Sequence, residues 1–148
     1  MNKVDTKLVT CNGCFDGLHP GHLFFLGFCR GLGSELIVGI NHDDYILQAK
    51  KRNPYYSQEE RSKALLSLGF VNRVVVFEED TPNEMLRKLK PSIHCTGEEY
   101  GENCPESEVC KELGTKLVLI PRINFWSISN LDEVNKEFVD SYMNRLLV

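Results

Sequence analysis

The sequence lacks the features of a membrane or secreted protein. No apolar run approaches the roughly 18 residues that a membrane-spanning helix needs. Residues 1–7 are mostly polar and contain no apolar segment of the kind that forms the centre of a signal peptide. These absences argue against an integral membrane protein and against secretion, and they predict a soluble protein of the cytoplasm.

An excess of positive charge is also missing. The chain has 17 Lys and Arg residues against 21 Asp and Glu residues, which gives a formal net charge of −4. A general nucleic-acid-binding protein needs a basic face to offset phosphate charge, so this balance argues against nucleic acid as a partner. It still allows a local basic cluster around one small anionic ligand.

The cysteines lack the spacing of a zinc site. Only Cys11 and Cys14 form a C-x-x-C pair, and a structural zinc site needs a second pair or two closely spaced histidines. A redox role is the alternative, but Cys11 ends an apolar strand and does not begin a helix. We predict reduced, partly buried thiols that pack as small apolar side chains. The remaining cysteines are Cys29, Cys95, Cys104 and Cys110.

The 148 residues alternate short apolar runs with helical patterns. A chain of this length is the size of one domain, and it buries roughly 68–70% of its unfolded surface without help from metals or disulfides. We predict a single domain over residues 1–148 with a Rossmann-like, doubly wound, parallel five-stranded sheet in three α/β/α layers. Strands are expected at 7–12, 35–40, 72–77, 91–96 and 116–120.

Helices are expected between these strands. The apolar pattern predicts helices over 21–32, 57–68, 106–113 and 131–146, with a polar loop over 41–56. Ser57 and Glu60 have the spacing of a capping box, and Thr81 is expected to cap a further helix that has Pro82 at its first position. In folds of this type, ligands bind outside the carboxyl ends of the strands.

The most informative segment is Asn12-Gly-Cys-Phe-Asp-Gly-Leu-His-Pro-Gly-His22, which follows the first strand and opens the first helix. His19 and His22 are three residues apart, so a helical turn places them on the same side. Gly21 leaves room for a phosphate near the backbone N–H groups of the helix start. A fortuitous pair of turn histidines is the alternative. Dinucleotide-binding and Walker motifs are both absent from the sequence.

This segment resembles the H-x-G-H signature of the cytidylyltransferase-like nucleotidyltransferases. The resemblance extends over residues 7–131 and includes segments 41–43, 55–61, 77–82, 89–91 and 97–100. The last three are most similar to the adenylyltransferase domain of bacterial ADP-heptose synthases. Glycerol-3-phosphate cytidylyltransferases are also similar.

The resemblance implies in-line transfer of a nucleoside monophosphate from ATP or CTP to a phosphorylated alcohol, with release of pyrophosphate. It implies Mg²⁺ bound mainly through the triphosphate, and a homodimer. His19, His22, Lys50 and Arg61 correspond to catalytic residues, and Lys50, Arg52 and Arg61 to candidates for the acceptor's phosphate. The alternatives are a solvated basic loop for residues 50–52 and a surface ion pair with Glu60 or Asp80 for Arg61.

Further positions correspond to the nucleotide-binding residues of the family. Asp16 is either a metal ligand, a residue that orients a histidine or a turn-stabilising residue. The full set by resemblance is Gly13, Cys14, Phe15, Asp16, Gly21, Gly97, Arg122, Ser127 and Ser129.

The sequence departs from the family pattern in two places. Phe125 and Ile128 stand where the family's last motif has glycine and threonine, and Thr96 stands where heptose synthases have lysine. Phe125 and Trp126 either stack on a base or pack at the core edge. The leading hypothesis is a heptose 1-phosphate adenylyltransferase-like enzyme. The alternatives are a glycerol 3-phosphate cytidylyltransferase and a nucleotide-binding protein that has lost turnover.

Overall fold

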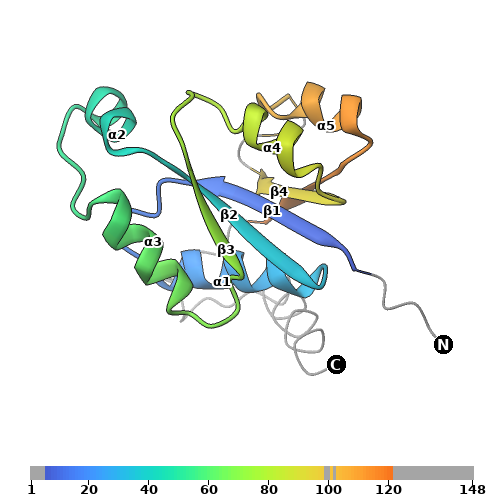
Figure 1. Cartoon of the computed structure of the whole chain (residues 1–148), viewed down its shortest axis with the longest axis horizontal. Helices are drawn as coiled ribbons and strands as arrows, with labels where there is room; N and C mark the ends of the chain where they lie inside the picture. The colour runs from blue at the N-terminus through green and yellow to red at the C-terminus, as the bar shows by residue number, and fades with distance from the viewer. Residues whose placement is uncertain (1–5, 99–100, 102, 122–148) are drawn as a thin grey trace.

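A computed structural model describes residues 6–98, 101 and 103–121 and shows a parallel sheet at its centre (Figure 1). The five strands are β1 (Leu8–Gly13), β2 (Glu35–Asn41), β3 (Arg73–Phe77), β4 (Ile93–Gly97) and β5 (Lys116–Ile120). All neighbouring strands pair in parallel, in the order β3-β2-β1-β4-β5. The predicted doubly wound fold is confirmed, and the strand order reverses between β1 and β4.

Helices cover both faces of the sheet. In Figure 1, α1 (Pro20–Gly31) and α3 (Gln58–Leu66) lie below the sheet, and α4 (Asn83–Leu89) and α5 (Ser107–Leu113) lie above it. The buried apolar residues form one cluster on each side: residues of β1, β2, α1 and α3 contribute to the first, and residues of β3, α4 and α5 to the second. This gives the three predicted layers.

The alternation of side chains along β1 and β4 places two of the cysteines in the core. Cys11 and Cys95 are paired in register, both are completely buried, and both belong to the cluster that contains Cys29 of α1. All six cysteines of the chain have free thiols, and Cys14 is the only one that is not buried. The prediction of reduced thiols that pack as apolar side chains is confirmed.

A polar contact lies on the opposite face of the same strands. Thr10 Oγ1 is 2.8 Å from His94 Nδ1, and His94 Nε2 is 3.8 Å from a carboxylate oxygen of Glu106, which caps α5. Burial raises the pKa of Glu106, but the neighbouring His94, the backbone N–H of Glu106 and the Cys104 side chain together outweigh burial and hold this pKa below its usual range. These three buried side chains join β1, β4 and α5.

The predicted loop over 41–56 is wrong in part, because it contains α2 (Asp43–Lys50). The helix starts with Asp43 and Asp44, whose charges favour the positive helix end, and it buries Ile46 against the rest of the protein. It ends at Lys51, which has a left-handed φ of 54°. One buried residue in eight gives little apolar periodicity, so the sequence pattern resembled a loop.

The remaining helix predictions hold with small shifts. The capping box of Ser57 and Glu60 is formed at the start of α3, and α5 ends at Gly114. Pro82 is itself the N-cap of α4 and not its first residue, so Thr81 does not cap this helix. The helix expected over 131–146 lies outside the described residues.

Across the described residues, none of the helices has both the length and the apolar character required to span a membrane.

Candidate functional site

The carboxyl ends of β1 and β2 carry most of the predicted site. Gly13 ends β1, Asn41 ends β2, and the segment 14–19 leads from β1 into α1. Gly97 ends β4 beside Ile120 of β5. Since the strand order reverses between β1 and β4, this edge is the crevice where doubly wound folds bind ligands.

His19 and His22 form a reciprocal cap at the start of α1. His19 Nδ1 accepts from the Gly21 N–H at 3.0 Å, and His22 Nδ1 accepts from the His19 N–H at 3.3 Å. The two rings lie on the same side of the helix start, with 3.7 Å between their centroids. Their predicted proximity is confirmed, although His19 precedes the helix with a φ of −127°.

Gly21 lies between the two histidines. We expected it to leave room for a phosphate near the backbone N–H groups of the helix start, and its own N–H donates to His19 Nδ1. A side chain at this position would displace the His19 ring, because a Cβ atom here would lie 2.8 Å from His19 Cε1. Gly21 therefore makes room for the His19 ring.

These hydrogen bonds indicate which ring nitrogen carries the proton in each histidine. Because each Nδ1 accepts a hydrogen bond, the ring proton resides on Nε2, which can donate to an oxyanion. Burial, with help from the neighbouring His19 and from Lys50, lowers the pKa of His22 to about 4, against a smaller opposing effect of the Gly17 backbone. His22 is therefore a neutral donor at pH 7.

The Phe15 ring packs against the His22 ring. Its backbone has a left-handed φ of 49°, which is unusual for a residue with a large side chain. The ring is buried in the core and lies edge-on to His22, with 5.4 Å between the ring centroids. A Cβ at Gly13 would come within 3.0 Å of this ring. The strained turn thus places Phe15 in the core, with Gly13 leaving space for it.

Asp16 ties the segment after β1 to the segment before α3. Its carboxylate accepts three hydrogen bonds, each 2.9 Å long: from Arg52 Nη1 and from the backbone N–H groups of Tyr55 and Tyr56. The side chain is only 2% exposed. Of the three predicted roles, this geometry favours the turn-stabilising one, because the hydrogen bonds of the carboxylate come from Arg52 and from backbone N–H groups and none comes from a histidine.

We expect Asp16→Asn to lower the free energy of unfolding by about 1.5–3 kcal/mol at pH 6, the scale of hydrogen bonds to a charged group. Burial raises the pKa of Asp16, but the bonds from Tyr55, Arg52 and Tyr56 outweigh it and lower the pKa below 3.8. A lowered pKa stabilises the fold above the unfolded value and loses that effect as pH falls.

The difference between wild type and Asp16→Asn in urea unfolding should therefore shrink between pH 6 and pH 3. Asp44→Asn is the matched control, since Asp44 is exposed in the first turn of α2. A difference that grows towards low pH would contradict this account of Asp16.

Arg52 and Lys50 lie on the same side of the site. Arg52 Nη1 donates to Asp16 and to the Asn53 carbonyl, and its guanidinium carbon lies 4.1 Å from the centre of the Tyr55 ring. Lys50 is exposed at the end of α2. Its charge acts on both Cys14 and His22, so it lies near the segment that leads into α1.

Arg61 is buried, which the sequence did not indicate. It is 1% exposed, and its guanidinium donates to the carbonyls of Tyr56, Cys14 and Asn41 and to the Asp43 carboxylate. The alternative of a surface ion pair with Glu60 or Asp80 is wrong, because the partner is Asp43 at 2.7 Å. The expected contact with a substrate phosphate is not supported by this geometry.

Cys14 and Asn41 complete the network. The Cys14 thiol lies 3.5 Å from the side-chain oxygen of Asn41, which ends β2. Burial raises the pKa of the Cys14 thiol, against the lowering effect of Lys50 and Arg61. The side chain is therefore a neutral thiol at pH 7, and its carbonyl is held by Arg61.

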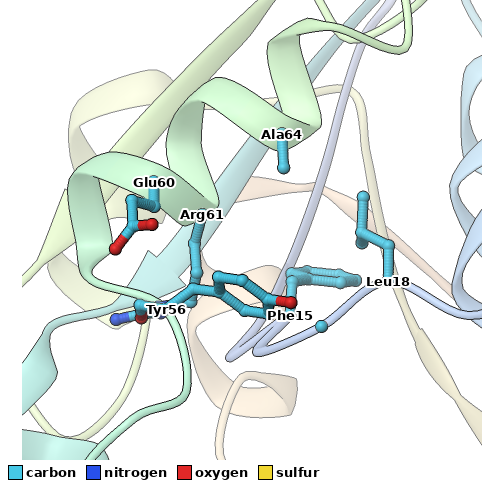
Figure 2. Close-up of a pocket in the computed structure, with 7 residues that line it drawn as sticks. Phe15, Leu18, Tyr56, Glu60, Arg61 and Ala64 are labelled. Carbon is cyan, nitrogen blue, oxygen red and sulfur yellow. Dashed lines mark hydrogen bonds between the residues drawn. The ribbon is translucent and has the colours of Figure 1, made fainter.

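A cavity of about 250 Å³ lies between the segment after β1 and α3. Figure 2 shows Arg61 reaching from α3 towards Tyr56, with the rings of Tyr56 and Phe15 side by side. Leu18 and Ala64 form the apolar part of the lining. The cavity borders the site at Phe15 and Arg61.

The other predicted residues lie at the edge of the site or outside the described residues. Gly97 is half-buried at the end of β4, beside the strand-order reversal. Arg122, Ser127 and Ser129, together with Phe125, Trp126 and Ile128, are outside the described residues, so the predictions about them stay predictions.

Sequence reasoning missed the parts played by Asn41, Asp43 and the backbone of residues 55–56. Asn41 and Asp43 were noted only through resemblance, although a polar residue directly after a buried strand is a signal for a site. The acidic pair that starts α2 was also visible in the sequence. The Asp16 contacts carried no signal, because they bridge residues about 40 positions apart.

Comparisons with known proteins agree with this geometry. Residues 10–142 match the family model described as Cytidylyltransferase-like. The chain is 42% identical over 113 residues to the bifunctional protein HldE of Campylobacter concisus, covering 75% of this chain and 24% of that protein. It is 41% identical over 129 residues to HldE of Helicobacter hepaticus, covering 86% and 26%. The chain thus spans about a quarter of the length of these relatives.

Among solved structures, the chain is similar to a lipopolysaccharide core biosynthesis protein from Thermoplasma volcanium. The TM-score is 0.67 at 25% sequence identity, and the match covers 80% of this chain and 98% of that one. Nearly all of a solved protein chain therefore corresponds to this fold.

Proposed function

The chain is a nucleotidyltransferase domain of the cytidylyltransferase-like family, and from this premise we propose that it transfers a nucleoside monophosphate to a sugar phosphate, with a heptose 1-phosphate as the leading acceptor and ATP as the donor. An oxygen of the acceptor's phosphate attacks the α-phosphorus of the triphosphate. A P–O bond forms there as the bond to the β-phosphate oxygen breaks, and pyrophosphate leaves.

The observation that carries this proposal is the capped histidine pair. Two imidazoles, each with a proton on Nε2, stand at the positive end of α1 and at the crevice of the sheet. Negative charge increases on the leaving pyrophosphate during transfer, and donors fixed in advance stabilise that charge without reorganising. The reciprocal cap holds both rings in place at the helix start.

The other residues position the reactants. Lys50 lies close enough to act electrostatically on His22, so we assign it to the phosphates. Arg61 holds the ends of β1 and β2 together through the carbonyls of Cys14 and Asn41. We assign it a positioning role. Positioning with charge stabilisation is enough for phosphoryl-type transfer.

Magnesium enters this proposal as part of the nucleotide substrate. Within the described ranges, no group of three or more His, Cys, Asp or Glu side chains is arranged to hold a metal ion. Asp16, the candidate ligand, already accepts three hydrogen bonds. The described residues therefore do not fit a protein-bound magnesium site, and no step is assigned to one.

The acceptor is proposed from the relatives. The HldE proteins are named bifunctional, and this chain covers about a quarter of each. We propose that it corresponds to the part of them that carries one activity. We also propose that the enzyme is cytoplasmic and forms a homodimer.

The test is pyrophosphate release from purified protein with Mg²⁺, each nucleoside triphosphate, and a panel of phosphorylated sugars and polyols. We expect release with ATP and a heptose 1-phosphate and little release with CTP and glycerol 3-phosphate. The reverse preference would identify a cytidylyltransferase. Nucleotide binding without release for any pair would show a protein that has lost turnover.

A further inference from the structure

His94 of β4 is a completely buried side chain with one ring nitrogen unpaired. Its Nδ1 lies 2.8 Å from Thr10 Oγ1, but its Nε2 has no hydrogen-bond partner among the described residues. A carboxylate oxygen of Glu106 lies 3.8 Å from Nε2, which is too far for a hydrogen bond. A buried polar atom without a partner costs free energy, so this contact is incomplete on the side of His94.

Glu106 is incomplete as well. It is 5% exposed, and among the described residues its ion-pair partner is His94, which carries a charge only when protonated. Burial raises the pKa of Glu106, but His94, the Glu106 backbone N–H and Cys104 together lower it, so the carboxylate is ionised at pH 7. A buried carboxylate without a counter-charge is unfavourable.

One proton on His94 supplies both missing partners. An imidazolium donates from both ring nitrogens, so Nδ1 donates to Thr10 Oγ1 while Nε2 donates to the Glu106 carboxylate. Its positive charge also balances the charge of the carboxylate. The two atoms that lie 3.8 Å apart would close to about 2.7–2.9 Å, the length of a charge-assisted hydrogen bond. The proton comes from solvent.

The neighbouring titratable groups do not take the place of this proton. Burial raises the pKa of the Cys104 thiol, and it raises the pKa of the Cys110 thiol to about 11. Both thiols are therefore neutral at pH 7. The charged side chains of α4 and α5, the two helices on this face of the sheet, are all exposed (Figure 1).

The contact joins two parts of the fold. Thr10 and His94 are paired in register across β1 and β4, where the strand order reverses. The two strands end three residues later, at Gly13 and Gly97, beside the crevice. Glu106 is the N-cap of α5. Closing the contact by about 1 Å therefore moves the start of α5 relative to the strands that border the crevice.

We propose that His94 and Glu106 form a proton-dependent latch. Uptake of a proton by His94 closes their contact into a buried ion pair and fixes the start of α5 against β4, and release of the proton opens it. Histidine is the side chain that ordinarily changes charge between about pH 5 and pH 8, so the latch responds to pH in this range. The inference goes beyond the proposed function, because it involves neither substrate.

The first test follows the protonation of His94 in the wild-type protein by ¹⁵N NMR of the histidine rings. Between pH 8 and pH 5, we expect the ring signals of His94 and the amide signals of Gly97 and Ser107 to move in one common transition. His94→Gln identifies the ring signals by their loss. A His94 ring that stays neutral down to pH 5 would overturn the proposal.

The second test measures closure by hydrogen exchange of the α5 amides, corrected for the intrinsic pH dependence of exchange. We expect the protection factors of α5 to be about 10-fold higher at pH 5.5 than at pH 7.5, the scale of a hydrogen bond between charged groups. The amides of α3, on the other face of the sheet, are the internal reference (Figure 1). An equal change in α3 would show a global effect and contradict a latch.

Glu106→Gln separates the latch from other effects of pH. We expect this variant to reduce the response of α5 to less than 2-fold, because a neutral amide does not attract an imidazolium. Glu108→Gln is the matched control, since Glu108 is exposed in the first turn of the same helix and should keep the 10-fold response. An equal response in wild type and Glu106→Gln would overturn the proposal. If Glu106→Gln does not fold, the wild-type measurements on His94 and α5 still decide it.

Discussion

Replacing His22 with alanine is expected to lower kcat by about 10²- to 10³-fold, the cost of losing one fixed donor to transition-state charge. His22 is held by the His19 backbone and by the edge of Phe15, so its Nε2 donor is placed before the substrate binds. The nucleotide KM should change far less than kcat, because the interaction strengthens as charge develops. Steady-state pyrophosphate release measures both constants.

Leu23→Ala is the control for this variant. Leu23 is the next residue of α1 and is 39% exposed, so its truncation should leave kcat within about 2-fold. Normal turnover by His22→Ala would remove the histidine pair from the mechanism. Because burial lowers the pKa of His22 to about 4, its protonation should not reduce activity between pH 5 and pH 8.

Replacing Arg61 with leucine should destabilise the fold by about 3–5 kcal/mol, the cost of removing one partner from a buried charged network. The variant leaves the carbonyls of Cys14 and Asn41 without their donor and removes the partner of Asp43. For a domain of this size, such a loss corresponds to a fall in Tm on the order of 10 °C. Thermal or urea unfolding measures it.

Arg87→Leu provides the contrast. Arg87 is an exposed arginine that pairs with Glu84 three residues earlier, and such surface pairs contribute little to stability. Arg61→Lys should be intermediate, because an ammonium has too few directed donors for four acceptors. A Tm for Arg61→Leu equal to that of Arg87→Leu would refute the structural role.

Local sequence patterns were sufficient for most elements. The apolar runs of β2 and β5 have no polar interruption that would suggest another structure, and the Ser57–Glu60 capping box is entirely local. The histidine pair was predictable for the same reason, since its spacing lies within a single turn. α2 was missed because its stability comes from one buried residue, Ile46, and from its acidic start.

The sequence by itself determined the alternation of strands and helices, the spacing of His19 and His22, and the glycine between them. It also carried the family resemblance, which the family match over residues 10–142 confirmed. Each of these depends on residues a few positions apart, whose geometry is set by the backbone.

Only the tertiary structure decided how Asp16 and the arginines are used. From the sequence, Arg61 and Arg52 were both candidates for binding a phosphate. Folding buries Arg61 against carbonyls of the β1 and β2 ends and leaves Arg52 partly exposed. Asp16 finds its partners about 40 residues away. Such partners depend on which loops the parallel sheet brings to the same edge. A short stretch of sequence does not contain that information.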